Sequence, residues 1–230
     1  MHKKKLVVLT GAGISAESGI KTFRDSGGLW EGHDVMEVAS PEGWRRNQDL
    51  VQEFYNLRRK QMYECQPNLA HRILAELEEH YEVQIITQNV DDLHERAGSS
   101  QVLHLHGELR KAQSSLDPKL VYDLDHWEIK KGDKCAKGSQ LRPHVVWFGE
   151  PVPKMLDAIE LAQQADIFVI VGTSLEVYPA ASLVSYVPDH AEIFVVDPNI
   201  PSSKLHHRAK HLVLPATQGL ENLKKILLKP

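Results

Sequence analysis

Cysteine is scarce in this chain, and other signals that would narrow its class are weak or missing. Two cysteines, Cys65 and Cys135, occur among 230 residues. That is too few for a disulfide framework and suits a reducing compartment. The formal net charge is −4, so the chain lacks the excess of positive charge that is typical of nucleic-acid-binding proteins. The basic residues 1–5 precede an apolar run too short for a signal peptide or membrane span. We expect a cytoplasmic protein with no nucleic-acid or membrane partner.

Hydrophobic residues make up 42% of the chain, enough for one sizeable core. Short apolar runs rich in β-branched residues recur, as is typical of strands buried on both faces of a parallel sheet. They cover residues 6–10, 83–87, 102–106, 167–171, 193–196 and 211–214. Helical patterns occupy residues 67–79, 153–164, 179–187 and 220–228. This alternation predicts an α/β fold, a Rossmann-like doubly wound parallel sheet.

Two segments interrupt the alternation. Residues 27–65 are predicted as loop plus helix, and residues 108–143 are polar with little periodicity. We expect both to be insertions that form a small second lobe of a single unit. The large lobe would then comprise residues 1–26, 66–107 and 144–230.

The most informative stretch is the glycine turn that follows the first apolar run. A strand that breaks into Gly-x-Gly-x-x-Ala commonly leads into a helix whose N-terminus faces a pyrophosphate. Gly11 and Gly13 would allow a tight turn and close approach to phosphates, and Ala16 would let the helix pack closely on the strand. A plain turn explains such a Gly-x-Gly about equally well. A polar loop at residues 20–30 stands where an ordinary dinucleotide fold has a second strand ending in an acidic residue.

Polar clusters follow three of the predicted strands. They are Gln88-Asn89-Val90-Asp91, Gly172-Thr173-Ser174 and Asp197-Pro198-Asn199. Each cluster alone is more often a turn or a helix cap. Because ligands bind at the carboxyl ends of strands in such sheets, the clusters and the glycine turn together predict a polar cleft.

Six motifs occur in one order along most of the chain. They are Gly11-Ala12-Gly13-Ile14-Ser15, Thr22-Phe23-Arg24, Gln88-Asn89-Val90-Asp91, His104-Leu105-His106-Gly107, Val146-Trp147-Phe148-Gly149-Glu150 and Gly172-Thr173-Ser174. In this order they resemble the sirtuin family, the NAD-dependent protein lysine deacylases. The resemblance implies that NAD is consumed. The acyl oxygen of a modified lysine on a protein substrate attacks the ribose carbon bearing nicotinamide, which leaves. The acyl group then migrates to a ribose hydroxyl and gives O-acyl-ADP-ribose.

His106 is the candidate general base for a ribose hydroxyl. Imidazole has an ordinary pKa of about 6.5 and can accept a proton near neutral pH. His104 lies two residues earlier on a strand-like run, so we expect the two to share a face. A pair of structural histidines is the alternative. The following Gly107, with the match to the family's His-Gly, favours His106 as the base and His104 as structural.

The resemblance also implies the NAD contacts. Asn89 and Asp91 would orient the nicotinamide ribose and carboxamide, and with His106 they form the predicted catalytic set. Gln88 would contact a ribose, and Thr173 and Ser174 phosphate or ribose. Asn199 and Ala216 would line the adenosine side. The other expected cofactor-binding residues are Gly11, Ala12, Gly13, Ser15, Thr22, Phe23, Arg24, Trp30, Val90, Gly172 and Asp197.

For the substrate, the resemblance implies that Val146, Trp147, Phe148 and Gly149 pair with the substrate backbone as an added strand. Ordinary core packing explains Trp147 or Phe148 about equally well when each is taken alone.

One predicted helix carries an arginine within an apolar stripe, formed by Val51, Phe54, Tyr55, Arg58 and Met62 at helical spacing. The guanidinium could simply reach solvent past its apolar stem. However, Tyr55 and Arg58 resemble the Tyr-x-x-Arg motif of the sirtuin branch that removes negatively charged acyl groups. The small Ala39 matches the residue that leaves room for a longer acyl chain. We therefore expect removal of succinyl and malonyl groups, and of acetyl groups as well.

The chain departs from the family at its zinc site. Many sirtuins hold zinc with two Cys-x-x-Cys pairs, but residues 112–115 here are Ala112-Gln113-Ser114-Ser115, and Cys135 is matched by Gly138. Because a tetrahedral site needs four ligands, we predict no zinc. The small lobe would instead rest on packing around Leu120, Tyr122, Leu124 and Trp127.

Three other functions are alternatives to deacylation. An NAD-dependent oxidoreductase is the main alternative, although no clear hydride-transfer constellation accompanies the glycine turn. A non-catalytic NAD-binding domain would bind NAD without releasing nicotinamide. A mono-ADP-ribosyl transferase would release nicotinamide but leave a labelled protein.

Overall fold

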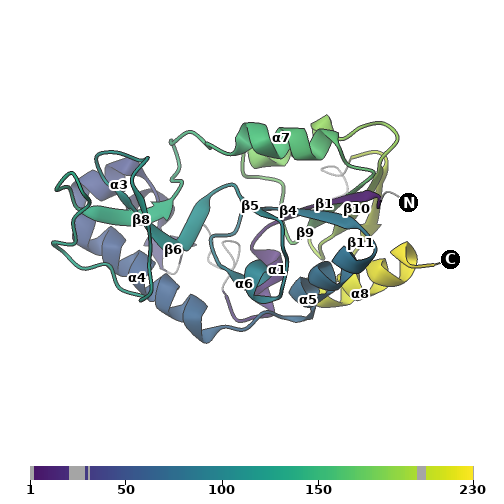
Figure 1. Cartoon of the computed structure of the whole chain (residues 1–230), viewed down its shortest axis with the longest axis horizontal. Coiled ribbons are helices and arrows are strands. Elements are labelled where there is room, and N and C mark those ends of the chain that lie inside the picture. The colour runs from purple at the N-terminus through teal and green to yellow at the C-terminus, as the bar shows by residue number, and fades with distance from the viewer. Residues whose placement is uncertain (1–2, 21–28, 31, 201–205, 230) are drawn as a thin grey trace.

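The largest sheet of the computed structural model is parallel; the structure describes residues 3–20, 29–30, 32–200 and 206–229. In this part of the chain six strands lie in the order β11-β10-β9-β1-β4-β5, and every neighbouring pair is parallel (Figure 1). The strands are β1 (Lys5–Thr10), β4 (Glu82–Thr87), β5 (Val102–His104), β9 (Ile167–Val171), β10 (Glu192–Val196) and β11 (Ala209–Leu212). The predicted α/β class with a doubly wound parallel sheet is confirmed.

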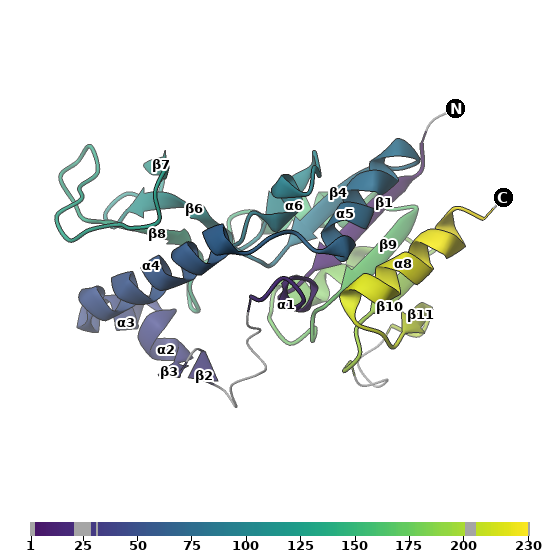
Figure 2. The ribbon, with the colours of Figure 1, turned by 90° about the horizontal axis from the view of Figure 1, so that it is seen from below.

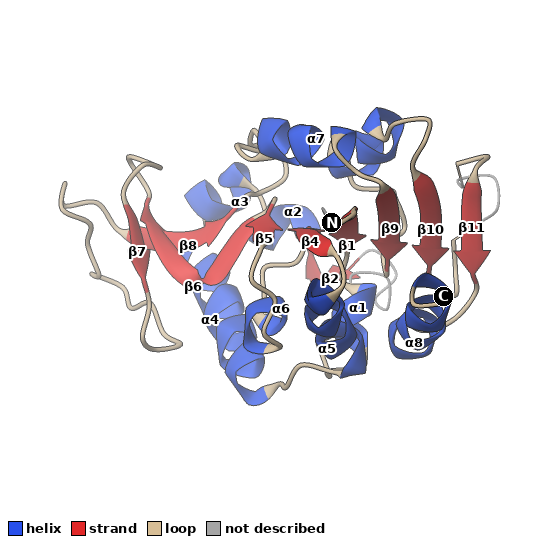
Figure 3. Cartoon of the chain, turned by 45° about the vertical axis from the view of Figure 1, so that its right-hand side comes forward, coloured by secondary structure: helices blue, strands red, loops and turns tan. Residues whose placement is uncertain are grey.

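Helices cover both faces of this sheet. Figure 3 shows α7 (Met155–Gln163) on one face, with α5 (Leu69–Glu76) and α8 (Ala216–Leu227) on the other. Successive side chains of β1 point to opposite faces of the sheet. Leu6 and Val8 pack in the core that contains α5 and α8, and Val7 and Leu9 pack in the core that contains α7. Strands buried on both faces account for the unbroken apolar runs in the sequence. Among the described helices, none combines the length and apolar character needed to span a membrane.

Several expected elements are shorter or of another type in the structure. The helix expected at 67–79 is α5 followed by the 3-10 turn η2 (Leu77–Glu79), and that expected at 179–187 is the 3-10 helix η3 (Ala180–Tyr186). The strand expected at 102–106 ends at His104, because the chain leaves the sheet there to enter β6 at Gly107.

The helix after the glycine turn is also short. It is α1 (Gly13–Ala16), one turn only. Ala16 is exposed and lines a cavity, so the expectation that it packs the helix against the strand is wrong. Its neighbour α5 begins after Asn68, whose side chain caps that helix and donates to the carbonyl of Ile14 over 2.8 Å. This bond ties α1 to the helical layer beside it.

A second, antiparallel sheet has the order β7-β6-β8 and lies beside the large one (Figures 1 and 2). Its strands are β6 (Gly107–Ser114), β7 (Val121–Asp123) and β8 (Leu141–Val145). The remaining elements are β2 (Leu29–Trp30), β3 (His33–Asp34), α2 (Val35–Val38), α3 (Pro41–Arg46), α4 (Gln48–Glu64) and α6 (Leu93–Arg96). Figure 2 shows α4 lying along this sheet. The lobe boundaries expected near residues 107 and 143 fall within β6 and β8, so paired strands, rather than linkers, connect the two sheets.

The core under the antiparallel sheet differs from the expected one. It consists of Ala112, Leu124 and Ile129, with Leu141 packed against them. Of the four residues expected, only Leu124 belongs to it, and Trp127 is 38% exposed.

A buried arginine supplements this small core. Arg59 is fully buried on α4 and donates to the side chain of Asn56 over 2.9 Å and to the carbonyl of Trp127 over 2.8 Å. It also donates to the carbonyl of Leu109. These bonds join α4 to β6 and to the loop after β7, and burial lowers the pKa of Arg59 to about 10.

Candidate active site

A cavity of about 870 Å³ opens at the carboxyl ends of β1, β4, β9 and β10 and extends to α2, α4 and the end of β8. Of the predicted catalytic and cofactor-binding residues, its wall includes Gly11, Ala12, Gly13, Trp30, Gln88, Asn89, Val90, Asp91, His106, Gly172, Thr173, Ser174, Asp197, Asn199 and Ala216. Of the predicted substrate-binding residues, it includes Ala39, Tyr55, Arg58, Val146, Trp147, Phe148 and Gly149. Ser15 lies buried behind the wall, and Thr22, Phe23 and Arg24 lie outside the described residues. The fold therefore brings the described candidates together.

The glycine turn is locked against the end of β9. Gly11 donates its N–H to the carbonyl of Val171 over 3.0 Å, and Gly13 donates to that of Gly172 over 2.8 Å. A Cβ on Gly13 would stand 2.6 Å from the Cα of Gly172, and Gly172 itself has a φ of +61°. The glycines are thus required by contact between two backbone segments as well as by any ligand.

A buried hydrogen-bond network holds the polar cluster after β4. The Asn89 amide donates to the carbonyl of Gly11 over 3.1 Å and to the Ser15 hydroxyl over 3.2 Å. Ser15 in turn donates to Asp91 over 3.1 Å, and Asp91 also accepts from the N–H of Leu93 over 3.2 Å. Burial raises the pKa of Asp91. Ser15 therefore sits between the two side chains and fixes their positions without reaching the cavity.

His106 lies on the cavity wall with one ring nitrogen engaged. Its Nδ1 is 3.1 Å from the carbonyl oxygen of Gln88. Because a carbonyl oxygen only accepts, Nδ1 carries the proton and Nε2 is the basic nitrogen. Burial lowers the pKa of His106, so the imidazole is neutral at neutral pH. The Gln88 side chain donates to the Thr173 hydroxyl over 3.1 Å, which links the ends of β4 and β9. The geometry suits a general base.

His104 occupies a different environment. Its Nε2 is 2.7 Å from the Glu95 carboxylate and its Nδ1 is 3.1 Å from the carbonyl oxygen of Asn89. Burial opposes the charge of His104, but the hydrogen bond and negative charge of Glu95 outweigh it and raise the pKa. His104 lines a separate hollow and is not on the wall that carries His106. The expectation that the two histidines share a face is wrong, because β5 ends at His104 and the two-residue alternation stops there.

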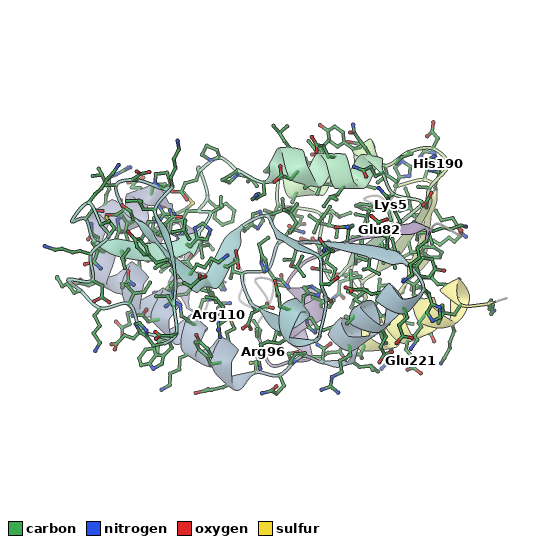
Figure 4. All side chains as sticks on the ribbon, in the orientation of Figure 1. Lys5, Glu82, Arg96, Arg110, His190 and Glu221 are labelled. Atoms are coloured by element: carbon green, nitrogen blue, oxygen red, sulfur yellow. The ribbon has the colours of Figure 1, made fainter. Side chains whose placement is uncertain are left out.

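Ion pairs among its own lining residues surround that second hollow. Arg96 and Arg110, both labelled in Figure 4, lie 3.4 and 3.7 Å from the carboxylate of Asp92. Charges of both signs thus compensate one another around it, and its chemistry differs from that of the large cavity.

The apolar stripe of α4 is buried as expected, with Tyr55 fully buried and Arg58 8% exposed. Arg58 therefore does not extend to solvent past its stem, as the alternative required. Its guanidinium carbon lies 4.4 Å from the centre of the Trp30 ring, and both Tyr55 and Arg58 line the cavity. The Tyr55 hydroxyl accepts a hydrogen bond from the Trp147 indole N–H over 3.1 Å. A positive charge and a phenol thus face one end of the cavity.

The segment after β8 is only partly open. The N–H groups of Val146, Trp147 and Phe148 donate to the carbonyl of His106, the carboxylate of Glu150 and the carbonyl of Ala39, over 2.8 to 2.9 Å. The Trp147 side chain is 2% exposed and belongs to a core cluster, whereas Phe148 is 42% exposed. Core packing thus explains the Trp147 ring but not that of Phe148. Pairing of this segment with a substrate strand stays a prediction.

Several residues of the wall were not among the predicted site residues. Glu150, Met36, Glu176, Tyr178 and Glu17 all line the cavity. Glu150 could have been assigned, because it is the last residue of the Val146-Trp147-Phe148-Gly149-Glu150 motif. The others carry no such signal, since they come from loops and exposed helix positions whose place depends on the fold.

No cluster of three or more His, Cys, Asp or Glu suited to a metal ion occurs in the described ranges. The two segments that the resemblance matches to the family's zinc cysteines do meet. Ser114 and Ser139 hydroxyls lie 2.9 Å apart, and the Cys135 sulfur lies 3.1 Å from Ser139. Hydrogen bonds from Ser114 and Ser139 lower the pKa of Cys135 to about 7.

Comparison with known proteins gives consistent matches. A model of the Sir2 family matches residues 11–179. An NAD-dependent protein deacylase of Helicobacter pylori is 54% identical over 228 residues, which is 98% of this chain and 96% of the relative. A Bacteroides thetaiotaomicron protein of the same name is 54% identical over 231 residues, 98% of each chain. A Sir2 homologue crystallised with NAD has a TM-score of 0.87 at 39% identity, covering 98% of this chain and 90% of that one. The resemblance noted in the sequence is confirmed: the chain belongs to the Sir2 family, the sirtuins.

Proposed function

We propose that this NAD-dependent protein deacylase prefers lysine acyl groups that end in a carboxylate, namely succinyl and malonyl, and also removes acetyl groups. Membership of the Sir2 family and the two relatives named NAD-dependent protein deacylase support the general activity. The preference rests on one observation. Arg58 is nearly buried, yet it lies on the cavity wall beside Tyr55.

We assign the proton transfer to His106. NAD supplies a ribose whose bond to nicotinamide is broken during the reaction. The neutral Nε2 of His106 would take a proton from a ribose hydroxyl, while its Nδ1 proton stays bonded to the carbonyl of Gln88. Asn89 and Asp91, fixed through Ser15, would hold the nicotinamide ribose and carboxamide. These roles are proposals that follow the match to the family's motifs.

We assign the acyl end of the cavity to α4. A guanidinium can bind a carboxylate through paired donors, and a phenol hydroxyl can add a third. Hydrogen bonds to charged groups contribute roughly 1.5–3 kcal/mol, which corresponds to about 10- to 150-fold in selectivity. Ala39, buried on the same wall, would leave room for the longer chain. Trp30 beside the guanidinium would keep that end of the cavity dry.

The test uses one peptide carrying unmodified, acetyl-, butyryl-, malonyl- or succinyl-lysine. Butyryl is the sharp control, because it has the four carbons of succinyl but ends in methyl instead of carboxylate. Peptide mass, nicotinamide and NADH are followed after addition of NAD. We expect kcat/KM for succinyl to exceed that for butyryl by about 10-fold or more. Equal rates on the two would contradict the acidic preference.

The same assay separates the other candidate functions. NADH formation would indicate an oxidoreductase, NAD binding without nicotinamide release a binding domain, and a heavier, labelled protein an ADP-ribosyl transferase. The His106→Ala variant is the matched control for deacylation, and its thermal unfolding shows whether the fold is retained.

A further inference from the structure

The Tyr55 hydroxyl accepts a hydrogen bond from a buried tryptophan. The indole Nε1–H of Trp147 donates to it over 3.1 Å, and the two rings lie 6.4 Å apart between centroids. Trp147 is 2% exposed and Tyr55 is fully buried, so water does not compete for this bond. Tyr55 comes from α4 and Trp147 from the segment after β8, so the bond is long-range and set by the fold.

This bond decides how the hydroxyl can act. A phenol oxygen can accept one hydrogen bond and donate its own proton in another direction. Because the oxygen accepts from Trp147, its O–H must point away from the indole. Tyr55 is fully buried but lines the cavity next to Arg58, so an acyl group that enters this end of the cavity would supply the acceptor for that proton. Without the indole N–H, the hydroxyl would be free to turn and donate elsewhere.

Trp147 is itself clamped by an ion pair. The guanidinium carbon of Arg142 lies 3.5 Å from the centre of the Trp147 ring. Arg142 donates to Glu150 through two bonds of 2.7 and 3.0 Å, and Glu150 accepts from the backbone N–H of Trp147 over 2.8 Å. Arg142 is buried, whereas the Glu150 side chain is 25% exposed and lines the cavity. The ring and the backbone of Trp147 are thus both held by this one ion pair, which suits a site that requires a defined side-chain orientation.

We propose that Trp147, held by Arg142 and Glu150, is a positioning residue that sets acyl selectivity by directing the Tyr55 hydroxyl into the acyl end of the cavity. The ligand class is an acyl group whose far end accepts hydrogen bonds. This inference rests on the proposed preference for carboxylate-ended groups. A tryptophan that merely filled space would affect all acyl groups alike.

The experiment is a double-mutant cycle of Trp147→Phe and Tyr55→Phe. Phenylalanine keeps an aromatic ring at position 147 but removes the N–H donor. The readout is the ratio of kcat/KM for succinyl to that for butyryl peptide. We expect Trp147→Phe to lower this ratio about 3- to 10-fold, the range for loss of one hydrogen bond, chiefly through KM. In the Tyr55→Phe background the same change should leave the ratio unaltered, because the hydroxyl that it orients is gone.

Two further variants test whether a general packing defect around the Trp147 ring explains the result. Trp44→Phe is the matched control, since the Trp44 ring packs against the Trp147 ring with 5.7 Å between centroids and Trp44 is not on the cavity wall. We expect it to leave the ratio unaltered. Arg142→Lys keeps the charge but loses the planar, paired contact, so the ratio should fall in the direction of Trp147→Phe. It serves as the deciding variant if Trp147→Phe does not fold.

The outcomes are distinct. A wild-type protein with no preference for succinyl over butyryl would overturn both the proposed function and this inference. A wild-type preference that persists in Trp147→Phe would overturn the inference alone. So would independent losses that multiply in the double variant, or a fall of equal size in Trp44→Phe.

Discussion

Gly13 donates its backbone N–H to the carbonyl of Gly172 over 2.8 Å, which joins the turn after β1 to the end of β9. Two neighbouring parallel strands thus end in backbone-to-backbone contact at the cavity wall. A Cβ on Gly172 would lie 2.4 Å from the N atom of Ile14, in a left-handed conformation that costs other residues about 1–2 kcal/mol. The position is closed to any side chain.

We predict that Gly172→Ala destabilises the protein by more than the conformational cost alone and weakens NAD binding. Gly132→Ala is the matched control, because Gly132 has a φ of +97° but no atom within 4 Å of a built Cβ. Thermal unfolding of both variants measures the difference, and calorimetric titration with NAD measures the affinity. Equal losses of stability would show that the contact with α1 does not matter.

Arg58→Met should lower desuccinylation far more than deacetylation. The apolar side chain fills similar space but offers no donor to a carboxylate, so about 10- to 150-fold of kcat/KM for succinyl should be lost. Arg58→Lys retains the charge without the paired donors, so its kcat/KM for the succinyl peptide should lie between those of the wild-type protein and Arg58→Met. Steady-state kinetics on matched peptides give the ratio. Similar losses on acetyl and succinyl peptides would defeat the carboxylate clamp.

The pH profile should report the lowered pKa of His106. Burial disfavours its charged form, so the neutral base persists below the ordinary value of 6.5. We therefore expect kcat/KM to be constant near neutrality and to fall only as the pH drops below about 6.5. An acid limb centred above that pH would be inconsistent with a buried imidazole as the base.

A buried histidine pair should make the fold acid-sensitive. The rings of His71 and His94 lie 4.9 Å apart, and burial lowers the pKa of His71 to about 4 and that of His94 well below 6.5. Glu95 and His104 are the other charged groups near them. The unfolded state takes up protons below pH 6.5 while the fold does not. The free energy of unfolding should therefore be highest above pH 6.5. It should fall as the pH drops toward 4, by about 1.4 kcal/mol per pH unit for each of the two histidines.

Urea unfolding at several pH values measures that slope. His71→Gln removes one of the two titrating histidines, so the dependence of the unfolding free energy on pH should become less steep. The variant should also be less stable than the wild-type protein at pH 7. His190→Gln is the control, since the His190 side chain is 67% exposed and should leave the slope unchanged. An unaltered slope in His71→Gln would contradict the assignment.

The protein should hold no structural zinc. Ser114 lies in the segment matched to the family's first cysteine pair, and Ser139 follows Gly138 of the second; with Cys135 they do not make a four-ligand site. Metal analysis of protein purified without added metal should find no stoichiometric zinc, and EDTA should leave the Tm unchanged. One equivalent of zinc per chain would overturn this.

Much of the fold could be predicted because its central strands are buried on both faces. Runs such as residues 167–171 have no polar face, and this favours a parallel sheet covered by helices. The antiparallel sheet was harder to predict, because it is short and the buried Arg59 supplements its small core. The sequence does not show that Arg59 is buried, because the carbonyl groups that accept its hydrogen bonds, such as that of Trp127, are brought to it only by the fold.

The sequence by itself determined the strand-end motifs and the helical spacing of Tyr55 and Arg58, because both depend on short-range geometry. Only the tertiary structure decided that His104 and His106 face different cavities. The same holds for the Trp147 bond to the Tyr55 hydroxyl, which joins residues 92 positions apart. Such contacts depend on how α4, β5 and β8 pack together, and no local pattern encodes that packing.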